Sequence, residues 1–147
     1  MENSLEELIV SVVVPFYNSN QYLQETIDSI LSNDSILEVI IVVDHGSDSP
    51  VIADDFFTKV RVIDNCYSGR GAGACRAAGF NKAKGRYVSF LDADDLWLPG
   101  KVRLQVHEMK CRNLALTFHT YRNFDAKRTY NSSIPQGPFT IDRFLKK

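Results

Sequence analysis

Three carboxylates lie close together where an apolar run ends. The run from Tyr87 to Leu91 leads directly into Asp92, Asp94 and Asp95. Like charges this close need solvent, a base or a cation to balance them, and a hard divalent metal with oxygen ligands does so most readily. Mg²⁺ or Mn²⁺ held by one or two carboxylates normally completes its shell with water and substrate phosphate oxygens. The cluster therefore indicates a metal-assisted nucleotide-diphosphate site, with a solvated acidic turn before a helix as the alternative.

Short apolar runs that alternate with helical patterns must position these acids. The runs are rich in β-branched residues and apolar on both faces, which is typical of strands buried in a parallel sheet. Strands are predicted at Ile9 to Val14, Val39 to Val43, Val60 to Ile63, Val88 to Leu91 and Leu114 to Thr120. Helices are predicted at Asn20 to Ser32, near Val51 to Phe57, at Gly71 to Lys84, and from Pro99 to about Arg112. This order predicts an α/β fold with an open, mostly parallel sheet and helices on both faces.

Polar clusters follow three of the predicted strands. Tyr17 and Asn18 come after the first strand, the stretch Asp44 to Ser47 after the second, and the three acids after the fourth. The carboxyl ends of parallel strands meet at one edge of the sheet, and ligands of such folds bind there. The three strand ends are therefore expected to converge on one crevice.

Composition excludes several classes of protein. The chain has 147 residues, of which 44% are hydrophobic, and it carries 17 basic and 18 acidic residues. This balance suits a folded domain and argues against nucleic acid as a partner. The three cysteines are widely spaced and show no metal-ligand pattern, which favours reduced thiols in the cytoplasm. No signal peptide or membrane-spanning run is recognised, so a cytoplasmic location is expected, with the inner face of the membrane as a further expectation for a longer protein.

Four segments in order resemble the N-terminal motifs of family 2 glycosyltransferases, which are inverting enzymes of the GT-A (Rossmann-like) fold. The segments are VSVVVPFYNSNQYLQETIDSIL, VIIVVDHGSDSP, GRGAGACRAAGFNKAKGRYVSFLDADD and LWLPGKV. The resemblance covers roughly residues 8 to 110 and rests on the order and spacing of the four motifs. It implies a nucleotide-sugar-binding α/β domain at residues 1–120. Residues 121–147 are then expected to be a loop and the start of an acceptor-side region.

The resemblance also implies a set of site residues. Asp92-Ala93-Asp94 corresponds to the D-x-D motif of the family, so Asp94 is the expected ligand of Mn²⁺ or Mg²⁺, and Asp92 is expected near the ribose. Tyr17 is expected to stack on the nucleotide base. The nucleotide-sugar site implied in this way comprises Pro15, Tyr17, Asp44, His45, Arg70, Arg76 and Asp92.

The implied activity is transfer of a sugar from a nucleotide-diphosphate sugar to an acceptor hydroxyl, with inversion and metal assistance. A UDP-sugar is the expected donor, the acceptor is unknown, and bacterial cell-surface polysaccharide or glycolipid synthesis is the expected role. Such a reaction needs a base that takes the proton of the attacking hydroxyl. The resemblance places this base beyond the fifth strand, and neither Asp125 nor Asp142 has a matching context, so no catalytic residue is assigned. The chain is therefore interpreted as the donor-binding half of a longer enzyme, truncated at its C-terminus, and it could form a homodimer over its exposed sheet edge.

One position departs from the family pattern. The family usually has two aspartates before Gly-Ser, whereas this chain has Asp44 followed by His45. A neutral imidazole can accept one hydrogen bond, so His45 leaves uracil binding open but does not establish the donor base. His45 as a metal ligand is a further alternative, although no second histidine lies at a suitable spacing.

Three other functions compete with this interpretation. The segment Gly69 to Ala74 imitates a dinucleotide-binding fingerprint, but it follows the third predicted strand rather than the first. A metal-dependent nucleotidyltransferase would need a glycine- and arginine-rich loop after the first strand, where this chain has Pro15 to Asn18. A catalytically incompetent module that only binds nucleotide diphosphates is the strongest rival.

Overall fold

The computed structural model describes residues 9–53, 58–124 and 129–131. They divide between two compact units, Met1–Glu108 and Met109–Lys147. The order of elements is β1 (Val10–Phe16), α1 (Asn20–Leu31), β2 (Ile36–Val43), β3 (Val60–Asp64), α2 (Ala72–Lys82), β4 (Tyr87–Phe90), α3 (Lys101–Arg112), β5 (Arg122–Phe124) and β6 (Thr129–Asn131).

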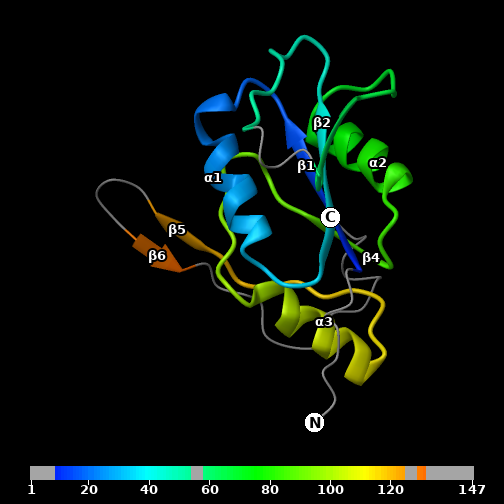
Figure 1. Cartoon of the computed structure of the whole chain (residues 1–147), viewed down its shortest axis with the longest axis vertical. Coiled ribbons are helices and arrows are strands. Elements are labelled where there is room, and N and C mark those ends of the chain that lie inside the picture. The colour runs from blue at the N-terminus through cyan, green and yellow to red at the C-terminus, as the bar shows by residue number, and fades with distance from the viewer. Residues whose placement is uncertain (1–8, 54–57, 125–128, 132–147) are drawn as a thin grey trace. The chain divides into compact units, whose positions relative to one another are not determined.

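The first unit is built on a parallel sheet (Figure 1). Its four strands lie in the order β3-β2-β1-β4, and all of the neighbouring strands are parallel. The predicted α/β fold and its first four strands are thereby confirmed. Strand order reverses at β1, which has β2 on one side and β4 on the other. In open α/β sheets such a switch point opens a crevice at the carboxyl ends of the strands.

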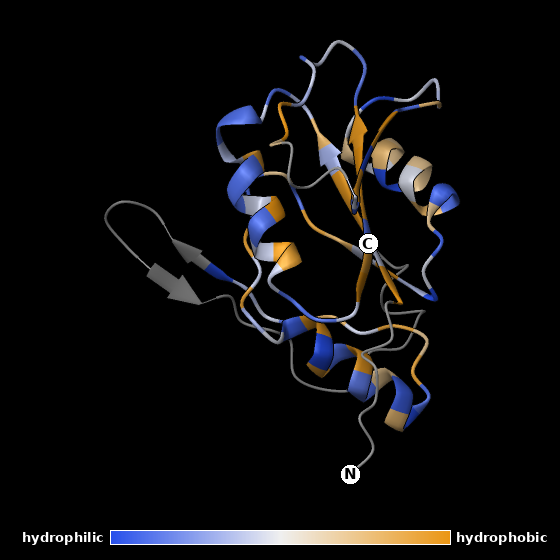
Figure 2. Ribbon diagram, viewed as in Figure 1, coloured by the Kyte–Doolittle hydropathy of each residue, from blue (hydrophilic) through white to orange (hydrophobic). Residues whose placement is uncertain are grey.

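Helices cover both faces of this sheet, as predicted. On one face, alternate residues of β1 and β2 pack against α1 and α3, and this larger core includes Leu23, Ile27, Trp97 and Val102. On the other face, Val13 and its β2 neighbours pack against Cys75 and Ala78 of α2. Figure 2 shows the strands as the most apolar part of the unit, with polar stripes on the outer sides of the helices. The two central strands, β1 and β2, are therefore buried on both faces, which explains why they are apolar over most of their length.

Strand β1 is longer than the sequence indicated, because it continues through Pro15 to Phe16. Alternate residues of a strand turn their backbone groups to opposite neighbours. The Phe16 carbonyl accepts from Asp44 on the β2 side, whereas the Val13 carbonyl accepts from Leu91 on the β4 side. Pro15 shares the β4 side with Val13, but the pairing of β1 with β4 ends at Val13 and Phe90. The missing N–H of Pro15 therefore leaves no hydrogen bond unmade.

Helix α2 lies close to the sheet at Gly79, which is buried. A methyl group added there would overlap Val13 Cγ1 and come within 3.0 and 3.1 Å of Val13 Cγ2 and Val42 Cγ2. The glycine therefore allows the helix backbone to approach β1 and β2.

A buried polar cluster ties the amino end of the sheet to the turn before β4. Glu38, 7% exposed, accepts hydrogen bonds from the Ser11 hydroxyl at 2.8 Å and from the Lys84 N–H at 2.8 Å, and it pairs with Arg61 at 2.9 Å. The Ser11 oxygen in turn accepts from the Gly85 N–H at 2.8 Å. Each buried polar group in this cluster thus has a partner, as burial requires.

Two predictions for the other elements need correction. Residues Leu114 to Thr120 form no strand, and the second unit instead has a two-stranded antiparallel sheet of β5 and β6. Leu116 and Phe118 are exposed, so the apolar alternation that predicted a strand has no neighbouring strand within the described residues. Helix α3 begins at Lys101 rather than at Pro99.

The helix predicted near Val51 to Phe57 can be judged only in part. Residues 51–53 are not helical, and residues 54–57 lie outside the described part of the chain. Among the described helices, none has the length and apolarity needed to cross a bilayer.

Candidate functional site

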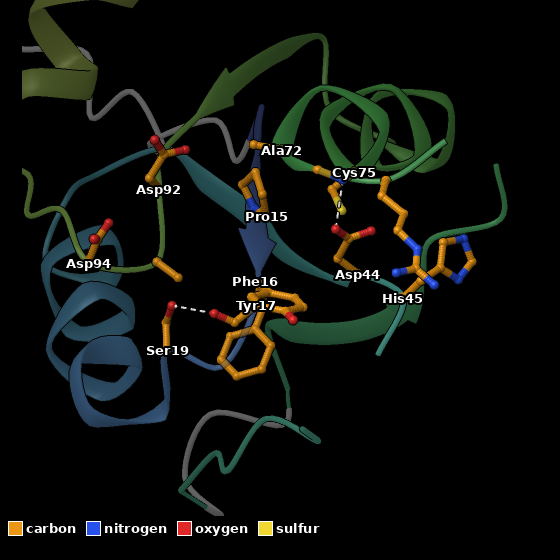
Figure 3. A pocket seen from close by; sticks show the side chains of 13 residues that line it. Pro15, Phe16, Tyr17, Ser19, Asp44, His45, Ala72, Cys75, Asp92 and Asp94 are labelled. Atoms are coloured by element: carbon orange, nitrogen blue, oxygen red, sulfur yellow. Dashed lines mark hydrogen bonds between the residues drawn. The ribbon is translucent and has the colours of Figure 1, made fainter. Parts of the chain in front are cut away.

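A pocket of about 500 Å³ opens at the carboxyl ends of β1, β2 and β4. This volume falls in the usual range for small-molecule sites. The pocket is lined by Pro15, Phe16, Tyr17, Ser19, Asp44, His45, Arg70, Gly71, Ala72, Cys75, Asp92, Ala93 and Asp94. In Figure 3, Asp92 and Asp94 lie on one side, Asp44, Cys75 and His45 lie on the other, and the β1 residues lie between them. The expected convergence of three strand ends is therefore observed.

Nearly all of the site residues predicted from the sequence line this pocket. The exception is Arg76, which is not among the lining residues and instead forms an ion pair with Asp92, with 2.5 Å between Arg76 Nη2 and Asp92 Oδ1. Both partners are partly exposed, at 36% and 48% of their side-chain surfaces. Arg76 therefore meets the pocket through Asp92, which it partly neutralises and orients.

The acids after β4 sit on a tight turn. The Asp95 N–H donates to the Asp92 carbonyl at 3.1 Å, which places Ala93 and Asp94 at the two corners. Asp94 is exposed, and its carboxylate makes no hydrogen bond or ion pair within the described residues. Burial, together with the charges of Asp94 and Asp92, raises the pKa of Asp95 above its ordinary value. The turn thus carries excess negative charge, which Arg76 opposes directly through its ion pair with Asp92.

Asp44, at the end of β2, anchors the glycine-rich loop before α2. Its Oδ1 accepts from the Asn65 amide at 3.0 Å and its Oδ2 from the Gly71 N–H at 2.7 Å. These two hydrogen bonds hold the pKa of Asp44 below its ordinary value. The thiol of Cys75 also donates to this carboxylate (Figure 3). Asp44 therefore lines the pocket with a charged group whose orientation is already fixed by its own chain.

His45 has a defined tautomer in its neutral form. Its Nε2 lies 2.7 Å from the backbone carbonyl of Tyr67. A carbonyl oxygen can only accept, so Nε2 carries the hydrogen and Nδ1 keeps a lone pair. The neutral His45 side chain can therefore offer one acceptor to a ligand.

Tyr17 lies at the mouth of the pocket with 57% of its surface exposed. The residues after it are tied to the loop after β2, because the Asn18 N–H donates to the Ser47 hydroxyl at 3.0 Å and the Asn18 side chain accepts from the Asp48 N–H at 2.8 Å. Asn18 itself has a φ of +50°, a conformation that asparagine tolerates better than most residues. An exposed aromatic ring on a tethered loop is a suitable platform for stacking.

Sequence reasoning missed several residues that shape the site. Asn65 links Asp44 to the Gly69 carbonyl, and Thr26 of α1 holds the turn that carries the acids. Both are side chains that contact residues distant in sequence, so no local motif marks them. Thr26 is polar, yet it is fully buried in the apolar face of α1. A buried polar residue within an amphipathic helix is the signal that could have identified it.

The carboxylates of the turn after β4 suit a metal ion that takes most of its ligands from water and the substrate. Within residues 9–53, 58–124 and 129–131, no three His, Cys, Asp or Glu side chains gather in an arrangement that could hold a metal ion. Asp94 offers an exposed carboxylate without a protein partner in the described residues, and Asp95 adds charge beside it. Mg²⁺ is commonly held by one or two carboxylates together with water and phosphate oxygens. The candidate base positions Asp125 and Asp142 lie outside the described residues.

Comparison with known proteins identifies relatives for nearly the whole chain. An uncharacterized glycosyltransferase of Rickettsia bellii is 30% identical over 97% of this chain and 21% of its own length. The Escherichia coli UDP-Glc:alpha-D-GlcNAc-diphosphoundecaprenol beta-1,3-glucosyltransferase WfgD is 23% identical over 97% of this chain and 57% of its own length. The chain thus spans between about a fifth and three fifths of the length of these curated relatives.

The fold also matches a solved glycosyltransferase structure. The S. aureus TarS 1-349 in complex with UDP-GlcNAc superposes with a TM-score of 0.55 and 23% identity, over 71% of this chain and 32% of that chain. This likeness supports the GT-A-like α/β fold expected from the sequence. The family model described as Glycosyl transferase family 2 matches residues 11–147. The chain belongs to glycosyltransferase family 2.

Proposed function

We propose that this chain binds a nucleotide-diphosphate sugar in the pocket at the β1/β4 switch point, for transfer of the sugar to an acceptor hydroxyl with inversion. The carrying observation is the pocket itself, which has an exposed acid, Asp94, on one side and the fixed polar groups Asp44 and His45 on the other. A nucleoside diphosphate also has two chemically different ends, a neutral base and a charged diphosphate, which can lie against the two sides of the pocket.

The base belongs at the Asp44 and His45 side of the pocket in this proposal. Tyr17 supplies a ring face for stacking, and His45 Nδ1 supplies an acceptor for an N–H of the base. Uracil has such an N–H at its ring N3, whereas cytosine has a lone pair there. This pairing supports a UDP-sugar as the donor. TarS, whose structure holds UDP-GlcNAc, has a similar fold.

The diphosphate belongs at the Asp94 side. Asp94 would hold Mn²⁺ or Mg²⁺, with Asp95 close by as an additional negative charge. When bound, the metal supplies Lewis-acid stabilisation of the departing diphosphate. Arg70 lines the same pocket and can place a guanidinium against the anion.

Asp92 orients the donor in this proposal. Its carboxylate keeps free acceptor positions after pairing with Arg76, so it can receive the hydroxyls of the ribose. Arg76 holds the rotamer of Asp92 and is therefore a positioning residue rather than a direct ligand. No base for the acceptor hydroxyl is assigned, because no described residue lies in a context that singles it out.

The names of the relatives support a role in polysaccharide or glycolipid synthesis. WfgD is named for transfer of glucose to a diphosphoundecaprenol-linked sugar. For this chain we propose the same general class of reaction, with the acceptor unassigned.

Calorimetric titration of the 147-residue chain with UDP tests this proposal. We expect binding that strengthens with Mn²⁺ and loses this dependence in Asp94→Ala. Asp34→Ala is the matched control, because it also removes an exposed carboxylate, but at the opposite edge of the sheet. Folded wild-type protein that binds neither UDP nor GDP, with or without Mn²⁺, would contradict the proposal. Metal-dependent binding of UDP without any transfer by a longer, folded form of the protein would favour the incompetent binding module instead.

A further inference from the structure

One face of α1 holds the backbone of the segment that follows β4. The Thr26 hydroxyl lies 3.0 Å from both the Ala93 carbonyl and the Asp95 carbonyl. One turn later, the Ser29 hydroxyl accepts from the Trp97 N–H at 3.1 Å. Residues three apart on a helix share a face, so α1 offers a row of polar groups to this segment.

Thr26 contacts the turn at the two positions that flank Asp94. Its single hydroxyl hydrogen is shared between the carbonyls of Ala93 and Asp95, the residues immediately before and after Asp94. The Thr26 side chain is fully buried, and Ala93 is 3% exposed. The carbonyl of Ala93 is therefore shielded from water, and Thr26 is its hydrogen-bond partner.

The Ala93 carbonyl belongs to the peptide group immediately before Asp94, whereas the Asp95 carbonyl belongs to the peptide group after Asp95. By holding both carbonyls, Thr26 restrains the short backbone segment that carries Asp94, and this backbone determines where the Asp94 side chain points. Asp94 itself makes no side-chain hydrogen bond within the described part of the chain that could fix it. Arg76 fixes Asp92 at the start of the same turn but does not reach Asp94. The Asp95 N–H, bonded to the Asp92 carbonyl at 3.1 Å, holds the peptide group that follows Asp94. Thr26 holds the peptide group before Asp94 and the carbonyl at the end of the segment.

We infer that Thr26 is a positioning residue for the metal site: its hydroxyl holds the peptide group before Asp94 and the carbonyl of the next residue, Asp95, and so aims the Asp94 carboxylate into the pocket. This inference rests on the proposed role of Asp94 in binding a divalent metal. A helix on one face of the sheet thereby contributes to the geometry of the crevice.

The test compares Thr26→Val with Thr26→Ser. Valine keeps the volume of threonine but lacks the hydroxyl, whereas serine keeps the hydroxyl. Groups that orient a metal ligand typically change metal affinity by roughly 10- to 100-fold when they are removed. We therefore expect Thr26→Val to raise the Mn²⁺ concentration needed for half-maximal UDP binding by roughly tenfold or more, and Thr26→Ser to restore the wild-type value to within about threefold. The affinity for UDP without metal is expected to change far less.

Ser11→Ala is the matched control for lost stability. Ser11 is also a fully buried hydroxyl with several hydrogen bonds, but it lies at the amino end of the sheet, away from the pocket. Denaturant unfolding places the variants on one stability scale. An equal rise in the Mn²⁺ requirement for Ser11→Ala and Thr26→Val, or no rise for Thr26→Val, overturns the inference.

Hydrogen exchange provides a readout without any ligand. We expect Thr26→Val to speed amide exchange at Asp95 and its neighbours in the turn, and Ser11→Ala to leave these amides unchanged. Unchanged exchange in a folded Thr26→Val variant, or in Thr26→Ala if valine prevents folding, also overturns the inference. The wild-type titration separates the two proposals. If Mn²⁺ does not change the affinity for UDP while amide exchange in the turn becomes faster in Thr26→Val, the metal proposal fails and the role of Thr26 is limited to the structure of the turn.

Discussion

The close approach of α2 to the sheet leads to a prediction about Gly79. In Gly79→Ala the new methyl group would overlap Val13 Cγ1 and lie 3.0 and 3.1 Å from Val13 Cγ2 and Val42 Cγ2. Carbon atoms normally pack about 3.5–4.0 Å apart. Both valines are fully buried, and β-branched side chains have few alternative rotamers, so neither can move aside easily.

The expected cost follows from two opposing effects. Overpacking a well-filled core typically costs about 1–3 kcal/mol, and the two stiff valines favour the upper end of this range. Replacing glycine by alanine in a helix returns about 1 kcal/mol. We therefore expect Gly79→Ala to lower the free energy of unfolding by about 2 kcal/mol. This corresponds to a fall of roughly 4–8 °C in Tm for a chain of this size.

Gly73→Ala is the matched control in the same helix. No atom lies within 4 Å of a methyl group added at Gly73, so only the helix propensity acts. We expect this variant to be as stable as the wild type or slightly more stable, by up to about 1 kcal/mol. Urea unfolding of both variants measures the difference.

A double variant tests the proposed cause directly. Val13→Ala removes the two Val13 methyl groups that the new methyl group would meet, so the double variant with Gly79→Ala should be more stable than the sum of the single effects implies. We expect a coupling free energy of about 1 kcal/mol or more, within the range seen for residues in contact. Additivity within about 0.5 kcal/mol, or a Gly79→Ala variant as stable as Gly73→Ala, would refute this reasoning.

Three further predictions concern titratable groups. Burial alone raises the pKa of Glu38, but hydrogen bonds from Lys84 and Ser11 and the charge of Arg61 outweigh it and hold this pKa below the ordinary 4.5. The contribution of Glu38 to stability is therefore full above pH 4.5 and is lost as the pH falls through the lower folded value. In urea unfolding from pH 7 to 3, Glu38→Gln should show a shallower acid dependence of stability than the wild type. Burial and the nearby Asp44 charge raise the pKa of the Cys75 thiol to about 11. A chromogenic disulfide reagent at pH 8 should therefore label the exposed Cys66 in the native protein and react with Cys75 only after unfolding. Equal labelling rates for the two thiols would contradict the described burial. Burial lowers the pKa of Lys101 from 10.5 to about 8, so the unfolded chain binds more protons than the folded chain between these two pH values. The free energy of unfolding should therefore rise with pH across that window, by at most about 1.4 kcal/mol per pH unit after allowance for solvent screening. Lys101→Met should remove this rise.

The parts of the fold that the sequence predicted are those with a local signature. The apolar runs of β1 and β2 are buried on both faces, and such strands can be recognised without knowledge of their neighbours. The apolar stripe of α1 predicted its buried face for the same reason, since Leu23, Ile27 and Ile30 follow the helical period. The clustering of the site residues followed from the rule that parallel strands end at one edge.

The misses have a common physical cause, because they depend on partners that a local pattern does not specify. Pro15 lies within β1 because the strand on that side ends before it. Leu114 to Thr120 alternates like a strand, but alternation does not supply a neighbouring strand. Arg76 forms an ion pair with Asp92, a contact that its position in the sequence does not specify. Thr26 contacts residues almost seventy positions away, with sequence separations of 67 and 69.

The proline in β1 has a consequence for how the sheet could change over evolution or by design. Beyond Val13, a neighbouring chain on the β4 side would meet Pro15, which has no N–H to donate. Lengthening β4, or adding a foreign strand along this margin, would therefore gain little backbone pairing at the place where the crevice begins. Substituting Pro15 by a residue with an N–H would remove that barrier and allow strand addition to close the entrance. Pro15 therefore keeps a further strand from pairing with β1 across the opening of the crevice.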